Sequence, residues 1–234
     1  MRVAVVAGAR EAALHGLDGC TYAPDDTAAL AAAEPTVVFA LGTTPPEGPW
    51  RTIVWGAALS SAARVVGAAG PVWRRAPLPA ADGLATLRGR RGAGVVVAGG
   101  DEAARESALA KLAARRVDAW GAAALTRPDL ERAAVVALLG APGEPLPDAA
   151  PAVLAAGRIL VAPRAQPGFG LLPWSDHLPY DNEDELACSA DVAQSFPEAF
   201  APIVAMGVLA AEAHRASAVY GRLAVDAELE DAAA

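Results

Sequence analysis

The chain has 234 residues, of which 54% are hydrophobic and 20% charged, and its net charge at pH 7 is −8. This length suits one large domain or two small ones, and a negative charge without a compensating basic cluster argues against nucleic acid as a partner. Of the 19 Lys and Arg residues only Lys111 is a lysine, so there is no Gly-Lys-Ser/Thr phosphate loop and no Schiff-base lysine is expected.

Cys20 and Cys188 lie far apart in the sequence without a CxxC spacing, which fits a reducing compartment. Residues 1–6 are too short for the apolar segment of a signal peptide and are typical of a first strand. No uninterrupted apolar run is long enough to span a membrane. The sequence therefore predicts a cytoplasmic protein without a membrane span.

Short apolar runs recur along the chain and predict strands. The runs are continuous rather than alternating, as expected of strands that are buried on both faces of a parallel sheet. The predicted strands are residues 2–7, 36–41, 52–55, 72–75, 95–98, 133–138 and 159–162.

Helical segments separate these runs. Residues 25–27 can cap a helix that ends at Pro35. Another helix is expected from Asp101 to Arg116, with acids in its first turn and arginines in its last. The other predicted helices are residues 129–132, one that begins within 181–185, and a long closing helix over 197–223. Strands that alternate with helices predict an α/β fold with parallel sheets.

A Pro- and Gly-rich stretch divides the chain near residue 90. It follows the segment 76–82 and precedes a fresh strand that is bounded by glycines. We therefore predict two small α/β domains, residues 1–88 and residues 91–234, the second of which carries the long closing helix. The loop over residues 166–179 is long for a connection, so it is a candidate functional segment.

Arg164 and Trp174 are candidate binding residues. Ligands of open parallel sheets bind beyond the carboxyl ends of the strands, and Arg164 lies at such an end. Its planar guanidinium suits a phosphate or a carboxylate, and a surface salt bridge explains it equally well. Trp174 can stack on a base or a sugar ring, or it can anchor the loop to the core.

Asp176 and His177 are adjacent in the same loop. Neighbouring side chains usually point apart, so residues 175–177 do not predict a hydrolase triad. His177 is a candidate general base or phosphate donor, with an ordinary loop histidine as the alternative. His214 on the closing helix and His15 after the first strand are more simply explained as structural residues.

Gly99 and Gly100 follow a predicted strand and would let the backbone approach a ligand closely, although any tight strand–helix turn can use two glycines. Gly92 and Gly94 precede that strand, whereas the glycines of a dinucleotide fingerprint follow one. The sequence contains no zinc-binding pattern and no GxSxG elbow, so no metal site is expected.

With these residues in view, the chain resembles the CgeB-type spore-protein glycosyltransferases, which belong to the GT-B class. The resemblance is clearest over residues 94–223. It rests there on a Gly-ended strand followed by a helix, an Ala-Gly turn before a short strand at 155–161, Tyr180 before an acidic helix, and Gly207 and His214 on the closing helix. In the front half, Trp55 and residues 78–82 match the family's strand ends.

The resemblance implies two Rossmann-like domains, and transfer of a sugar from a nucleotide-sugar donor to an acceptor without a metal or a bound cofactor. On this hypothesis the donor is bound by Gly99, Gly100, Arg164, Trp174 and Tyr180, and Asp176 and His177 are catalytic. The sequence departs from the family in two respects. Ala152 stands where such transferases usually carry a glutamate that holds the donor ribose, and the front half is shorter than usual.

Two other hypotheses remain open. The missing glutamate and the apolar closing helix favour a non-catalytic binding or dimerisation module on the same scaffold, in which this helix is the surface of a homodimer. The third hypothesis is an unrelated α/β enzyme that acts on a nucleoside or an acidic metabolite.

Overall fold

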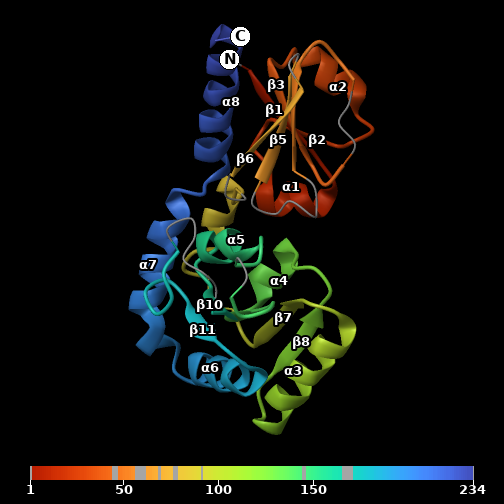
Figure 1. Ribbon diagram of the computed structural model, residues 1–234. Coiled ribbons are helices and arrows are strands. Elements are labelled where there is room, and N and C mark those ends of the chain that lie inside the picture. The colour runs from red at the N-terminus through yellow and green to blue at the C-terminus, as the bar shows by residue number, and fades with distance from the viewer. Residues whose placement is uncertain are drawn as a thin grey trace. The chain divides into compact units, whose positions relative to one another are not determined.

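The computed structural model describes residues 2–43, 47–55, 62–67, 70–75, 79–90, 92–143, 146–164 and 171–233. Within these ranges, the side chains of residues 51, 54–75 and 226–233 are not described. The protein is α/β, with two sheets that contain parallel strands and a helix at the C-terminus (Figure 1). The fold class predicted from the sequence is confirmed.

The chain divides into two compact units, and the first comprises Met1–Gly83 and Ala213–Ala234. Its sheet has the strand order β2-β1-β3-β4-β5-β6, in which the first four strands are parallel and β5 and β6 pair antiparallel. The strands are β1 (Val3–Ala7), β2 (Thr21–Tyr22), β3 (Val37–Leu41), β4 (Arg51–Trp55), β5 (Ala62–Gly67) and β6 (Gly70–Arg75). The helices are α1 (Ala9–His15), α2 (Thr27–Ala32) and α8 (Ala216–Ala233).

Helix α8 supplies one side of the core of this unit. Alternate residues of β1 and β3 face α8, and the residues between them pack with Leu30 of α2 on the opposite face. Tyr220 of α8 is fully buried, with its ring 4.7 Å from that of Phe39, and its hydroxyl donates to the His15 carbonyl at 2.6 Å. The aromatic contact and the hydrogen bond fix the helix on the sheet.

The second unit, Leu84–Glu212, contains a sheet of five parallel strands in the order β11-β10-β9-β7-β8. Its strands are β7 (Val95–Gly99), β8 (Ala119–Ala122), β9 (Val135–Leu139), β10 (Ile159–Pro163) and β11 (Leu178–Tyr180). Its α-helices are α3 (Glu102–Ala114), α4 (Arg127–Arg132), α5 (Ala150–Ala155), α6 (Glu183–Ser195) and α7 (Ala201–Glu212), and two 3-10 helices are η1 (Asp82–Leu87), which begins in the first unit, and η2 (Pro197–Phe200).

The central strands of this sheet are buried on both faces. Val95, Val135 and Ile159 face a layer built from α3, α6 and the start of α7. Their neighbours Val96, Val136 and Leu160 are also fully buried, and α5 lies against β10. Burial on both faces explains why these strands are continuous Val- and Ala-rich runs.

The C-terminal segment differs from the prediction of one long helix over 197–223. Helix α7 ends at Glu212, and α8 begins at Ala216. Between them, the His214 carbonyl accepts from the Ala80 amide at 2.7 Å, and the Ala216 amide donates to the Ala80 carbonyl at 2.8 Å. These strand-like bonds interrupt the helix. They also explain why residues 213–234 group with the first unit, whereas the sequence placed them with residues 91–212.

The pKa of His15 generates a prediction about the first unit. His15 is buried, its Nδ1 lies 2.6 Å from the Pro79 carbonyl oxygen, and burial lowers its pKa from 6.5 to about 4. The unfolded chain therefore takes up this proton first as the pH falls. Above pH 6.5, the titration of His15 leaves the free energy of unfolding unchanged. The free energy of unfolding falls by about 3 kcal/mol in total as the pH drops from 6.5 to 4.

Urea unfolding of the wild type and of His15→Asn at pH 7, 5.5 and 4 measures this difference. The asparagine amide can replace the bond to Pro79 but does not titrate. The stability of the wild type should fall more steeply than that of the variant, and identical pH profiles would contradict the assignment.

Candidate functional site

The carboxyl ends of the parallel strands gather several of the predicted site residues at one edge of the second sheet. Gly99 and Gly100 lie at the end of β7, Arg164 follows β10, and Tyr180 ends β11. The loop after β10 returns to the amino end of β11, so Trp174, Asp176 and His177, which directly precede β11, lie away from this edge. We call the rim that carries Gly99, Gly100 and Arg164 the carboxyl edge.

The turn after β7 needs its two glycines. Gly99 and Gly100 have φ values of +84° and +59°, and a Cβ on Gly100 would lie 3.1 Å from the Leu139 side chain. Arg105 Nη1 donates to both glycine carbonyls, at 3.1 and 2.6 Å. The Asp101 carboxylate accepts from the Ala104 amide at 2.8 Å and caps α3. The turn therefore directs the N-terminus of a 13-residue helix toward the carboxyl edge.

Arg164 forms an ion pair at this edge. Its Nε lies 2.9 Å from both carboxylate oxygens of Asp181, and the two side chains are 47% and 43% exposed. An exposed pair of this kind contributes little stability, typically 0–1 kcal/mol. Arg164 therefore forms a surface salt bridge, which is one of the two roles that the sequence left open, and replacing Asp181 by another anion as its partner would cost little.

The acidic start of α6 is largely bound by its neighbours. Glu183 accepts from the Ser107 hydroxyl and Asp184 pairs with Lys111, each at 2.6 Å. Glu185 accepts from the Asp181 amide at 2.8 Å, and the Asn182 side chain caps the helix. The acids that the sequence places around Tyr180 thus hold α6 against α3.

Tyr180 has a structural position. Its ring is buried, and its hydroxyl donates to the Leu138 carbonyl at 2.9 Å, which links β11 to β9. Burial raises the pKa of the hydroxyl to about 12. Because the proton is held by the backbone, the hydroxyl is not directed at a ligand.

Asp176 and His177 pair directly, so the prediction that these neighbours point apart is wrong. His177 Nδ1 lies 2.6 Å from Asp176 Oδ1, and the other Asp176 oxygen accepts from the Leu172 amide at 2.6 Å. The two residues are 1% and 3% exposed. Their side chains meet because the tight turn over residues 172–176 folds Asp176 back, with the Trp174 amide donating to the His177 carbonyl. His177 Nε2 is buried and has no hydrogen-bond partner among the described residues.

Trp174 projects from this turn. Its backbone has φ +64°, an unusual value for a bulky residue, and its side chain is 61% exposed. The ring therefore does not anchor the loop in the core, and it remains free to stack on a planar ligand.

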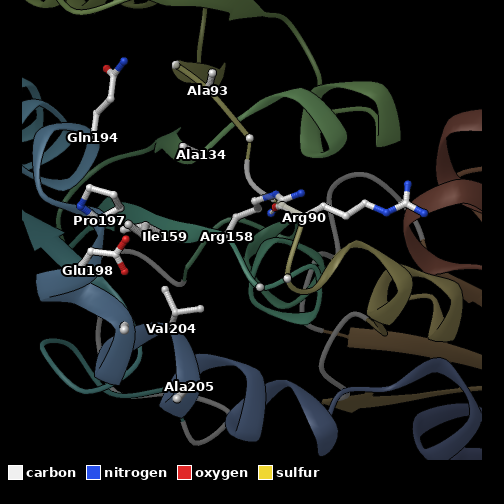
Figure 2. Close-up of a pocket in the computed structure, with 15 residues that line it drawn as sticks. Arg90, Ala93, Ala134, Arg158, Ile159, Gln194, Pro197, Glu198, Val204 and Ala205 are labelled. Atoms are coloured by element: carbon white, nitrogen blue, oxygen red, sulfur yellow. Dashed lines mark hydrogen bonds between the residues drawn. The ribbon is translucent and has the colours of Figure 1, made fainter.

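Sequence reasoning missed a pocket at the opposite edge of this sheet, where the strands begin (Figure 2). Its volume is about 610 Å³, within the range of small-molecule sites. It is lined by Gly89, Arg90, Gly92, Ala93, Gly94, Ala134, Gly157, Arg158, Ile159, Gln194, Pro197, Glu198, Ala201, Val204 and Ala205. The available signal was Arg158, a cation set between the Gly157 turn and an apolar strand. We call this cavity the amino-edge pocket.

Among the residues that the structure describes, no group of three or more His, Cys, Asp or Glu side chains is arranged to hold a metal ion. No single described helix is long and apolar enough to cross a membrane. The pair formed by α6 and residues 197–212, bent by 106°, meets the criteria of length and composition only when taken together. Comparison with protein-family models and with curated proteins finds no match to this chain.

Gly207 of α7 holds the Asp176–His177 turn in place. A Cβ at this position would lie 2.8 Å from both the Asp176 carbonyl oxygen and a Leu154 methyl group. Gly207→Ala should therefore destabilise the protein by about 1–3 kcal/mol through overpacking, even though alanine favours a helix by about 1 kcal/mol.

Gly221 of α8 is the matched control, since a Cβ there meets no atom within 4 Å. Gly221→Ala should stabilise the protein by about 0.5–1 kcal/mol. Urea unfolding measures both variants. A stabilising Gly207→Ala would show that α7 does not press on this turn.

Proposed function

We propose that the protein is a glycosyltransferase that binds a nucleotide-sugar donor at the carboxyl edge of its second unit and needs no metal. The supporting observation is that one edge of a Rossmann-like sheet carries both the Gly99–Gly100 turn and Arg164. In open α/β sheets this is the edge at which ligands bind. Its glycine turn, helix N-terminus and arginine are of the types that bind phosphates.

Arg164 is the proposed ligand of the donor diphosphate. It would exchange its exposed pair with Asp181 for the diphosphate, which carries more charge and presents more acceptor oxygens. The N-terminus of α3 would face the same phosphates across the Gly99–Gly100 turn. Together they would stabilise the negative charge that develops on the leaving diphosphate.

His177 is the proposed base. When its Nδ1–H donates to Asp176, the lone pair lies on Nε2, which has no partner among the described residues. Nε2 would accept the proton of the acceptor hydroxyl as that oxygen bonds to the sugar and the diphosphate leaves. Because His177 is 1% exposed and precedes β11 at its amino end, this role requires the 171–177 turn to open and to move toward the carboxyl edge when the acceptor binds.

The second candidate is a non-catalytic nucleotide-binding module, favoured by Ala152. This residue lies in α5 and is fully buried, so the glutamate of the resembled transferases has no open position there. Either function suits the cytoplasm, where the free thiols of Cys20 and Cys188 would stay reduced.

Calorimetric titration with UDP, GDP, UDP-glucose and GDP-mannose tests donor binding. At least one nucleotide should bind the wild type, and Arg164→Ala should weaken that binding about tenfold or more, which corresponds to about 1.4 kcal/mol. Arg115→Ala is the control, because Arg115 forms a similar exposed pair with Asp191 beyond the opposite end of α3. Equal loss in both variants, or no binding to the wild type, would contradict the proposal.

Hydrolysis of the bound nucleotide-sugar separates the two candidates. For a transferase, His177→Gln should lower the turnover number by about 100-fold or more without changing nucleotide affinity. If the wild type binds the donor but releases no nucleoside diphosphate faster than His177→Gln does, the binding module is the better description.

A further inference from the structure

The amino-edge pocket lies against the buried guanidinium of Arg158. The residue is 4% exposed, its Nε donates to the Leu130 carbonyl at 2.7 Å, and its Nη1 donates to the Arg90 carbonyl at 2.6 Å. Its Nη2 is buried and has no hydrogen-bond partner among the described residues. The Nη2 group of Arg158 is therefore a buried hydrogen-bond donor that still needs an acceptor.

The charge of Arg158 is also poorly compensated. Burial lowers the pKa of the guanidinium, the nearby charge of Arg90 lowers it further, and Glu131 opposes these effects. Its two bonded partners are neutral carbonyls rather than a carboxylate. A buried cation normally has an anionic partner, because an uncompensated charge is costly in a medium of low dielectric constant. An anion bound in the pocket would therefore compensate the buried charge of Arg158.

The opposite wall of the pocket presents a buried oxygen that needs a hydrogen-bond donor. Gln194 Oε1 is buried without a hydrogen-bond partner among the described residues, so it lacks a donor. Glu198 also lines this wall and adds negative charge. In Figure 2, Arg158 lies on one side of Ile159, and Gln194, Pro197 and Glu198 lie on the other. Ile159, Ala134 and Val204 make the surface between them apolar.

We propose that the amino-edge pocket binds an ω-amino acid, in which a methylene chain separates the carboxylate from the ammonium group. The carboxylate supplies the acceptor that Arg158 Nη2 lacks, and the ammonium group donates to Gln194 Oε1 on the opposite wall. The methylene chain covers Ile159 and Val204. Since Nη2 is closed to solvent, the carboxylate displaces a neighbouring side chain to reach it. This site is separate from the carboxyl edge and does not depend on the function proposed there.

Calorimetric titration with 5-aminopentanoate and 6-aminohexanoate tests the proposal, with 6-aminohexanamide and 6-acetamidohexanoate as probes of the two charged groups. At least one of the ω-amino acids should bind. Removing the carboxylate in the amide, or the ammonium group in the acetylated form, should weaken binding at least tenfold. Arg158→Met, which keeps the length of the side chain but not its charge, should have a similar effect.

Ala205→Trp keeps the test decisive if Arg158→Met does not fold, because Ala205 is an exposed residue of α7 that lines the pocket. Its indole should fill the cavity and abolish binding. Leu209→Trp, an exposed position on the same helix outside the pocket, should bind as the wild type does. Absence of binding to the wild type, equal affinity for 6-aminohexanoate and 6-aminohexanamide, or unchanged binding in Ala205→Trp would overturn the proposal.

Discussion

The parallel direction of the five strands in the second unit is the constraint on which the rest of this account depends. Helices cover both faces of the sheet, so the central strands are apolar throughout and have no room for polar chemistry on a face. Polar side chains are therefore confined to the two edges. All carboxyl ends lie at one edge and all amino ends at the other, which gives the unit two chemically distinct rims.

The two rims differ in how their charges are satisfied. At the carboxyl edge, Arg164 pairs with Asp181, and the acids of α6 are bound by Ser107, Lys111 and the helix cap. These contacts are largely exposed, so exchanging them for a ligand costs little. At the amino edge, Arg158 is buried, and one of its nitrogens has no acceptor among the described residues. At the carboxyl edge, a ligand can replace Asp181 as the partner of Arg164. At the amino edge, a ligand can supply the acceptor that Arg158 lacks.

The sequence predicted the elements whose signals are local. Each of the seven predicted strands overlaps an observed strand. In β1, β3, β7, β9 and β10, burial on both faces leaves a continuous apolar run. The predicted helix starts near residues 26, 101 and 182 were also correct, since Asp26, Asp101 and Asn182 cap their helices with their own side chains. The short strands β2, β8 and β11 were missed, because an edge strand of two to four residues has no run long enough to recognise.

Features that depend on tertiary contacts could not be predicted from local sequence patterns. The break between α7 and α8 depends on backbone bonds to Ala80, which lies more than a hundred residues earlier in the sequence. The pairing of Asp176 with His177 depends on a turn that holds Trp174 at positive φ. The amino-edge pocket joins residues 89–90 and 92–94, the starts of three strands and the α6–α7 corner, which no local pattern connects.

The separation of the two rims is most directly tested by mapping where a nucleotide binds, through the backbone amide NMR shifts of the protein titrated with the nucleoside diphosphate that binds it best. A nucleotide bound at the carboxyl edge should shift Gly99, Gly100 and Arg164 and leave Gly94, Gly157 and Arg158 unaffected. Shifts concentrated at the amino-edge residues, or spread evenly over both rims, would contradict the account.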